Sequence, residues 1–125
     1  MRRLGLDHLV ASFADNVLAQ QAAIEAGRPI VGNRHARQYV AAWQALCSHG
    51  DAGRDALVPL LDHPQPPVAV MAAVFLLRYR TERCLSVLHA WATAPGLIGF
   101  EAQQAIERWA DGSWALDPST SKPDA

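Results

Sequence analysis

The first half of the chain carries apolar residues at steps of three and four, the spacing of one face of an α-helix. A first helix of about five turns has this stripe: Leu6, Leu9, Val10, Phe13, Val17 and Ile24. Gly27 followed by Arg28 and Pro29 predicts its end, because glycine closes helices and proline cannot continue them. Asn33 is a good N-cap for a second helix. That helix ends at Gly50, and its stripe consists of Tyr39, Ala42, Trp43 and Leu46.

The second half of the chain predicts four shorter helices separated by proline and glycine. A third helix over residues 52–61 ends at the segment DHPQPP, where the prolines remove backbone donors and turn the chain. Pro67 suits the first position of a fourth helix, and Thr81 can cap a fifth. A sixth helix follows the break at Pro95 and Gly96. No stretch alternates at period two for long enough to form a strand, so the pattern predicts an all-α fold.

A shift of 30 residues brings the last four helices into register with themselves. Apolar positions then fall on apolar positions: Leu57 on Val87, Leu61 on Trp91, Val68 on Ile98, Ala72 on Ala102 and Leu76 on Ile106. Stacked units of this kind bury a continuous core that a single unit cannot. The almost unbroken apolar run PVAVMAAVFLL is therefore expected at the centre of a short solenoid of about six helices, with the first helix as its N-terminal cap.

Three segments together resemble a bacterial family of uncharacterised small proteins with a HEAT-like α–α superhelix: ALVPLLDHPQPPVAVMAAVFLL, NRH and APGLIGFEAQQAIERW. The resemblance covers most of residues 6 to 110. One position departs from the pattern, since HEAT-like corners often continue with valine and arginine, whereas Val68 is followed by Ala69. The resemblance implies a fold and no established activity. HEAT-like proteins mostly bind other macromolecules, and some small ones are immunity proteins that neutralise a partner toxin.

Composition mainly excludes classes of function. The formal net charge is -1, whereas nucleic-acid binders normally show a concentrated basic face, so binding to nucleic acid is the least expected function. No apolar run reaches the roughly 18 residues that span a bilayer. We expect a cytoplasmic monomer or weak homodimer with one helical domain over residues 1–111 and a partly disordered tail over residues 112–125. Within that tail, Trp114 and Leu116 are expected to fold back onto the body. Cys47 and Cys84 are expected to be small buried thiols, although their pattern leaves a disulfide open.

The sequence contains no recognisable catalytic or metal-binding pattern, so we expect neither an enzyme nor a cofactor. None of the five histidines has a second histidine four residues away, and no nucleophile elbow or phosphate-binding loop occurs. The residue Glu101 is explained as a surface charge near a helix N-terminus. An alternative hypothesis is a small-ligand-binding protein or enzyme with a pocket at the polar cluster Asn33, Arg34 and His35.

The repeat geometry predicts a surface across the second, fourth and sixth helices, which we call the inner ridge. Residues two positions beyond the stripe lie about 200° around a helix and face away from its partner. The inner ridge consists of Arg37, Val40, Gln44, Ser48, Val70, Val74, Arg78, Phe100, Gln104 and Arg108. Arginine around an apolar centre is typical of protein interfaces. The main hypothesis is therefore a non-enzymatic module that binds a partner protein, with an immunity protein as its sharpest form. The first helix could instead cover the ridge.

Overall fold

The structure is a computed structural model that describes residues 2–116, with side chains from residue 5 onward. Its elements are α1 (Arg2–Glu25), α2 (Pro29–Cys47), α3 (Asp51–Leu57), the 3-10 helix η1 (Val58–Asp62), α4 (Pro66–Leu76), α5 (Thr81–Trp91) and α6 (Gly96–Asp111). These residues contain no β-strand, which confirms the all-α class. None of these helices is both long and apolar enough to cross a membrane.

The connection between α1 and α2 is shorter than the sequence pattern predicts. Gly27 adopts a φ of 73° and closes α1, and the Arg28 N–H donates to the Ala23 carbonyl oxygen at 2.8 Å. Pro29 then begins α2 directly, because the first position of a helix requires no backbone donor. The prediction that Asn33 caps this helix is therefore wrong, since Asn33 lies inside it.

The proline corner between α3 and α4 also differs in detail. The third helix is regular only to Leu57 and continues as the tighter η1, in which Pro59 occupies the first turn. The fourth helix begins at Pro66, one residue before the predicted Pro67. The chain thus reverses within a few residues, as the prolines predict.

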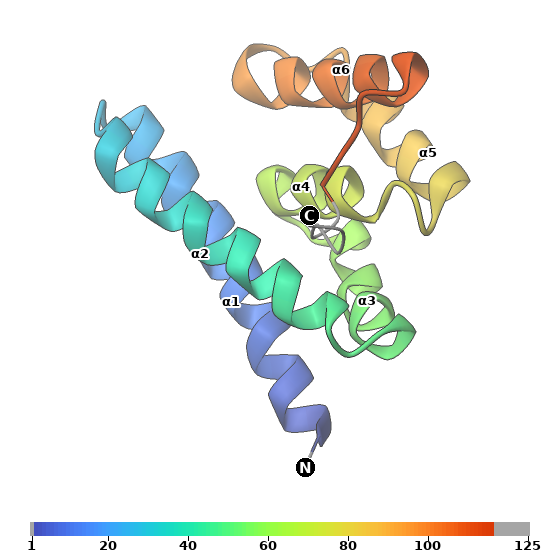
Figure 1. The fold of residues 1–125 in the computed structure, drawn as a ribbon. Coiled ribbons are helices and arrows are strands. Elements are labelled where there is room, and N and C mark those ends of the chain that lie inside the picture. The colour runs from blue at the N-terminus through green and yellow to red at the C-terminus, as the bar shows by residue number, and fades with distance from the viewer. Residues whose placement is uncertain (1, 117–125) are drawn as a thin grey trace, which may run out of the picture.

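Helix α4 lies at the centre of the molecule, as the apolar run predicts. Every residue from 68 to 77 is buried except Val74, which is half-buried. In Figure 1, α1 and α2 lie side by side on one flank, α4 lies in the middle, and α6 lies at the end far from the N-terminus. Helix α4 contacts α1, α3, η1, α5 and α6. Its Phe75 ring packs against the rings of Phe13, Tyr39 and Trp43, with centroids 5.4 to 6.1 Å apart.

Positions that the 30-residue shift aligns have similar burial in some cases, but the later position of a pair is often more exposed. Ala72 and Ala102 are both completely buried. Leu57, Leu61 and Leu76 are also buried, whereas their equivalents are only partly buried: Val87, Trp91 and Ile106. The reason is that α5 and α6 each pack against fewer of the described elements than α4 does.

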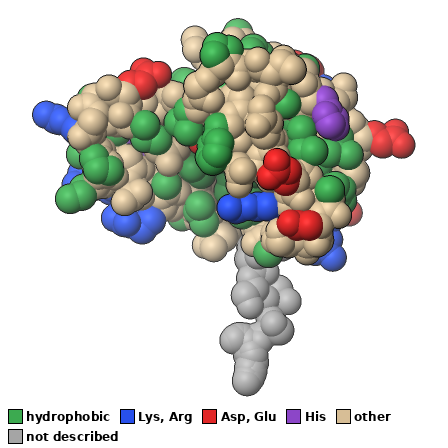
Figure 2. Space-filling view, turned by 90° about the horizontal axis from the view of Figure 1, so that it is seen from above, with side chains coloured by type: hydrophobic (Ala, Val, Ile, Leu, Met, Phe, Trp, Pro, Cys, Tyr) green, Lys and Arg blue, Asp and Glu red, His purple; other side chains and the backbone are tan. Residues whose placement is uncertain are grey.

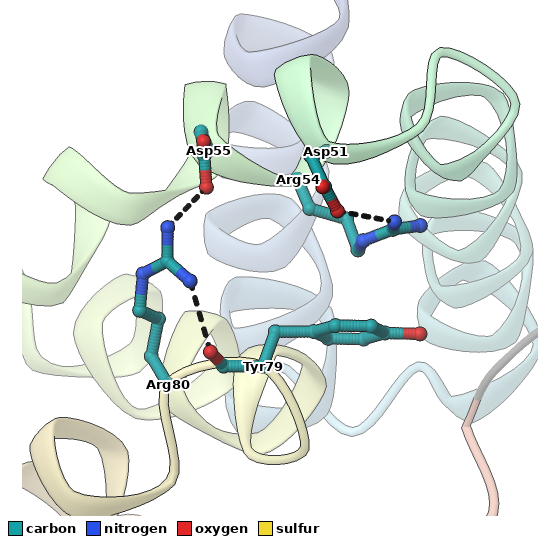
Figure 3. A network of polar contacts seen from close by, with 5 residues as sticks. All are labelled: Asp51, Arg54, Asp55, Tyr79 and Arg80. Carbon is teal, nitrogen blue, oxygen red and sulfur yellow. Dashed lines mark hydrogen bonds and ion pairs between the residues drawn. The ribbon is translucent and has the colours of Figure 1, made fainter.

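A network of charged side chains joins α3 to the turn between α4 and α5 (Figure 3). Arg80 pairs with Asp55 and also donates to the Tyr79 carbonyl oxygen at 2.9 Å. Arg54 pairs with Asp51 at 2.8 Å, and its guanidinium carbon lies 4.5 Å from the centre of the Tyr79 ring. Because the carboxylates of Asp51 and Asp55 are largely exposed to solvent, we assign these pairs a positioning role rather than a large contribution to stability.

Both cysteines are free thiols. Cys84 is completely buried on α5, and this burial raises the pKa of its thiol to about 12. Its side chain therefore behaves as a small apolar group rather than as a nucleophile. Cys47 is only partly buried, which differs from the expectation for that residue.

Candidate functional site

A pocket of about 490 Å³ opens between three helices and the segment that follows α6. Its walls consist of Tyr39 and Val40 from α2, Met71, Val74 and Phe75 from α4, Phe100, Glu101, Gln104, Ala105 and Arg108 from α6, and residues 113–116. The lining is mostly apolar and contains four aromatic rings. A volume of this size lies within the range of ligand-binding pockets in proteins.

Helix α6 supplies the largest share of the lining because of its periodicity. Phe100, Gln104 and Arg108 are four residues apart and follow one face of the helix. Glu101 and Ala105 lie beside them on the side that turns towards the core. Phe100 is 58% exposed, which is unusual for a large aromatic side chain. The space-filling view shows small groups of acidic and basic side chains among exposed apolar ones (Figure 2).

Residues 113–116 form the remaining wall of the pocket, and two indole groups hold them in place. Gly112 adopts a φ of 83° and ends α6, after which the chain runs back towards α4 (Figure 1). The Trp114 Nε1–H donates to the Val74 carbonyl oxygen at 2.8 Å, and the Trp43 Nε1–H donates to the Leu116 carbonyl oxygen at 3.0 Å. This part of the predicted tail is therefore packed against the helices. Residues 117–125 of the predicted tail lie outside the described residues.

Glu101 has the most perturbed carboxyl group in the pocket. Burial raises the pKa of this carboxyl to about 7. Within the described residues, Glu101 forms no hydrogen bond or ion pair that would stabilise its charged form. Its carboxyl therefore changes charge near neutral pH, whereas the sequence interpretation treated it as an ordinary surface charge.

Tyr39 lies close enough to Glu101 to be affected by its charge. The pKa of the Tyr39 hydroxyl is raised first by burial and then by the negative charge of Glu101. This hydroxyl donates to Gln20 Oε1 at 3.2 Å, so its proton points to α1 and not to Glu101. The Glu101 carboxyl therefore lines the pocket without a hydrogen bond from this hydroxyl.

The structure brings half of the predicted inner ridge together around this pocket. The lining includes these ridge residues: Val40, Val74, Phe100, Gln104 and Arg108. Four other ridge residues are exposed but do not line the pocket: Arg37 and Gln44 on α2, Ser48 directly after α2, and Arg78. The prediction that Val70 belongs to this surface is wrong, because Val70 is 0% exposed and is not available to a partner. The reason is that α4 has neighbouring elements on most of its sides.

The alternative polar cluster on α2 lies elsewhere, and none of its three residues lines the pocket. Asn33 and Arg34 are exposed, whereas His35 is half-buried. Asn16 Nδ2 donates to the Ser12 carbonyl oxygen at 2.8 Å, which directs Asn16 Oδ1 to His35 Nδ1 at 2.9 Å. Because an amide oxygen only accepts, Nδ1 carries the proton in this arrangement. His35 therefore links α2 to α1.

Sequence reasoning missed Glu101 and Trp114 as members of the site. In the sequence, Glu101 directly precedes Ala102, one of the apolar positions aligned by the 30-residue shift, and this neighbour was the signal for partial burial. Trp114 was expected to fold back on the body, but nothing local indicated the carbonyl group that it binds. Among the described residues, no group of three or more His, Cys, Asp and Glu side chains could hold a metal ion.

No family model matches the chain, and no curated protein matches it. In structure, the chain is similar to the crystal structure of the protein RPA1889 from Rhodopseudomonas palustris CGA009. The two superpose with a TM-score of 0.80 at 23% sequence identity, over 94% of this chain and 93% of that chain. This similarity shows a shared fold alone. The resemblance to a HEAT-like family stays a prediction.

Proposed function

We propose that the chain is a non-enzymatic binding module that recognises a partner protein through the pocket and the ridge residues at its mouth. In this proposal its helix pairs form a short HEAT-like α–α superhelix, with α1 as the N-terminal cap. The most specific version of the proposal is an immunity protein that neutralises a toxin. This version is supported by the family resemblance alone.

The observation that carries this proposal is the exposed Phe100 at the edge of an apolar pocket. Gln104 and Arg108 extend the same face of α6, so an aromatic group is accompanied by polar side chains. This combination is typical of the residues that contribute most to protein interfaces. Complete burial of a phenylalanine side chain contributes about 1.5 to 3 kcal/mol, so covering the exposed 58% of Phe100 contributes about 1 to 2 kcal/mol to association.

A ligand-binding protein or enzyme is the second candidate, and Glu101 is the observation that favours it. A carboxyl group that titrates near pH 7 is suited to transfer protons. Within the described part of the pocket, however, no hydrogen-bonded nucleophile or second acid accompanies Glu101. The site thus supports binding better than catalysis.

The proposal is tested by a pair of charge-adding substitutions, Phe100→Glu and Ile30→Glu. Ile30 is 76% exposed in the first turn of α2 and does not line the pocket, so it is a matched control. The tagged protein is used to capture partners from the native host, and the partner is then purified for a direct titration. We expect Phe100→Glu to weaken binding at least tenfold and Ile30→Glu to leave it unchanged. Circular dichroism checks that both variants are folded.

Two results would contradict the proposal. One is a Phe100→Glu variant that is folded and binds the partner with wild-type affinity. The other is equal loss of binding in Phe100→Glu and Ile30→Glu, which would show that the pocket has no special role.

A further inference from the structure

We infer that the pocket accepts an arginine side chain of the partner protein, with its guanidinium group against Glu101 and its aliphatic part against the aromatic walls. The inference rests on the proposed function, since it names the chemical group that the partner presents.

The first argument is charge. A carboxylate that is withdrawn from water without a partner is costly, and a cation that enters the pocket offsets this cost. Among the described residues that line the pocket, Arg108 is the one with a basic side chain, and it lies seven positions after Glu101 in the sequence. This separation corresponds to about 10 Å along the helix axis. Burial is accordingly the cause of the raised pKa of Glu101, with no opposing effect from Arg108.

The second argument is the aromatic lining around that carboxylate. Among the described residues, four aromatic rings line the pocket: Tyr39 from α2, Phe75 from α4, Phe100 from α6 and Trp114 from the segment after α6. Ring faces attract cations, and a planar guanidinium can stack on a ring while it donates two parallel hydrogen bonds to a carboxylate. A lysine ammonium is more strongly hydrated and has no planar face. The lining therefore favours arginine over lysine.

The third argument is that the chain already holds one of its own arginines in this way. Arg54 lies over the ring of Tyr79, with 4.5 Å to the ring centre, while it pairs with Asp51 at 2.8 Å (Figure 3). A ring and a carboxylate together position that guanidinium. The pocket presents the same two chemical groups, and Glu101 has no partner among the described residues.

The charge of Glu101 also predicts how binding depends on pH. Two other titratable groups of the described lining matter here: Tyr39 on α2, whose raised pKa keeps it neutral, and Arg108 on α6. The lining residues of α4 and of segment 113–116 carry no ionisable side chain. A guanidinium keeps its charge throughout this range. Affinity for a guanidinium should therefore rise as the pH increases through about 7, where Glu101 loses its proton.

The experiment compares butylguanidinium with N-butylurea, a neutral compound of nearly the same shape, in titrations of the full chain. Binding is followed by NMR at the indole N–H signals, with Trp114 in the pocket wall and Trp91 outside the described lining. At about pH 8 we expect the guanidinium to bind about tenfold more tightly than the urea and to shift the Trp114 signal. Glu101→Gln or a pH near 5.5 should reduce this preference to about twofold.

The inference is overturned if the two probes bind equally at about pH 8, or if Glu101→Gln leaves the preference for guanidinium unchanged. It is also overturned if neither probe binds up to about 50 mM, where a ligand of this size should be detected. One result would contradict this inference without contradicting the proposed function. If Phe100→Glu abolishes partner binding while Glu101→Gln preserves it, the interface stands and the arginine contact is wrong.

Discussion

Replacing Glu101 by glutamine should stabilise the protein at alkaline pH and have little effect at acidic pH. Burial raises the pKa of Glu101 to about 7 in the folded state, whereas the ordinary value of a glutamate is 4.5. The folded protein therefore binds a proton more tightly than the unfolded chain does. The resulting stability is complete below pH 4.5 and is lost as the pH rises to about 7. Above that pH, wild type retains a poorly solvated carboxylate that glutamine does not have.

The size of the effect follows from this difference in pKa. At 1.36 kcal/mol per pH unit, a rise from 4.5 to about 7 corresponds to roughly 3 kcal/mol. Because the carboxyl is only partly buried, solvent screening reduces this value, and we expect about 1 to 2 kcal/mol. The gain should be about 1 to 2 kcal/mol near pH 8 and below about 0.5 kcal/mol near pH 5.

The assay is urea unfolding of wild type and Glu101→Gln at these two pH values. Glu107→Gln is the control, because Glu107 is exposed on the same helix and its substitution removes the same charge. The control should change the free energy of unfolding by no more than about 0.5 kcal/mol at either pH. A Glu101→Gln variant with no gain near pH 8, or with the same gain at both values, would refute the reasoning about burial.

Two further predictions concern close contacts between neighbouring segments, one of α3 with α2 and one of residue 114 with α4. Gly53→Ala places a Cβ atom 1.8 Å from a carbonyl oxygen at the end of α2 and should cost about 3 kcal/mol in thermal or urea unfolding. Gly5→Ala, with nothing within 4 Å, should cost nothing, and equal effects would contradict this packing. Trp114→Phe removes the donor to the Val74 carbonyl and should lower the free energy of unfolding by about 1 kcal/mol. Trp91→Phe is its control, since Trp91 forms no indole hydrogen bond within the described residues, and a larger loss in that variant would contradict the assignment.

The helical class and the central place of α4 could be predicted because their signals are local. Apolar spacing, prolines and glycines act within a few residues, and the run from Val68 to Leu77 is apolar on every side of its helix. The start of α2 was misplaced because two local signals compete there. Pro29 and Asn33 both suit a helix start, and the closure of α1 at Gly27 decides in favour of Pro29.

The candidate site could be predicted only in part. The 30-residue shift aligns Val74 with Gln104, and the helical spacing of four residues places Phe100 beside Gln104; these three residues line one pocket. The same period placed Val70 on that surface, but its burial depends on the elements that pack around α4.

The amino-acid order by itself determined which segments coil, where they turn and which residues recur on one side of the helices, because these depend on neighbours along the chain. Only the tertiary structure decided that residues 113–116 return to α4 and form a wall of the pocket. That contact joins Trp114 to a carbonyl group 40 positions earlier in the chain. Only this packing also withdraws Glu101 from water, since solvation depends on atoms from α2, α4 and α6 that meet in space.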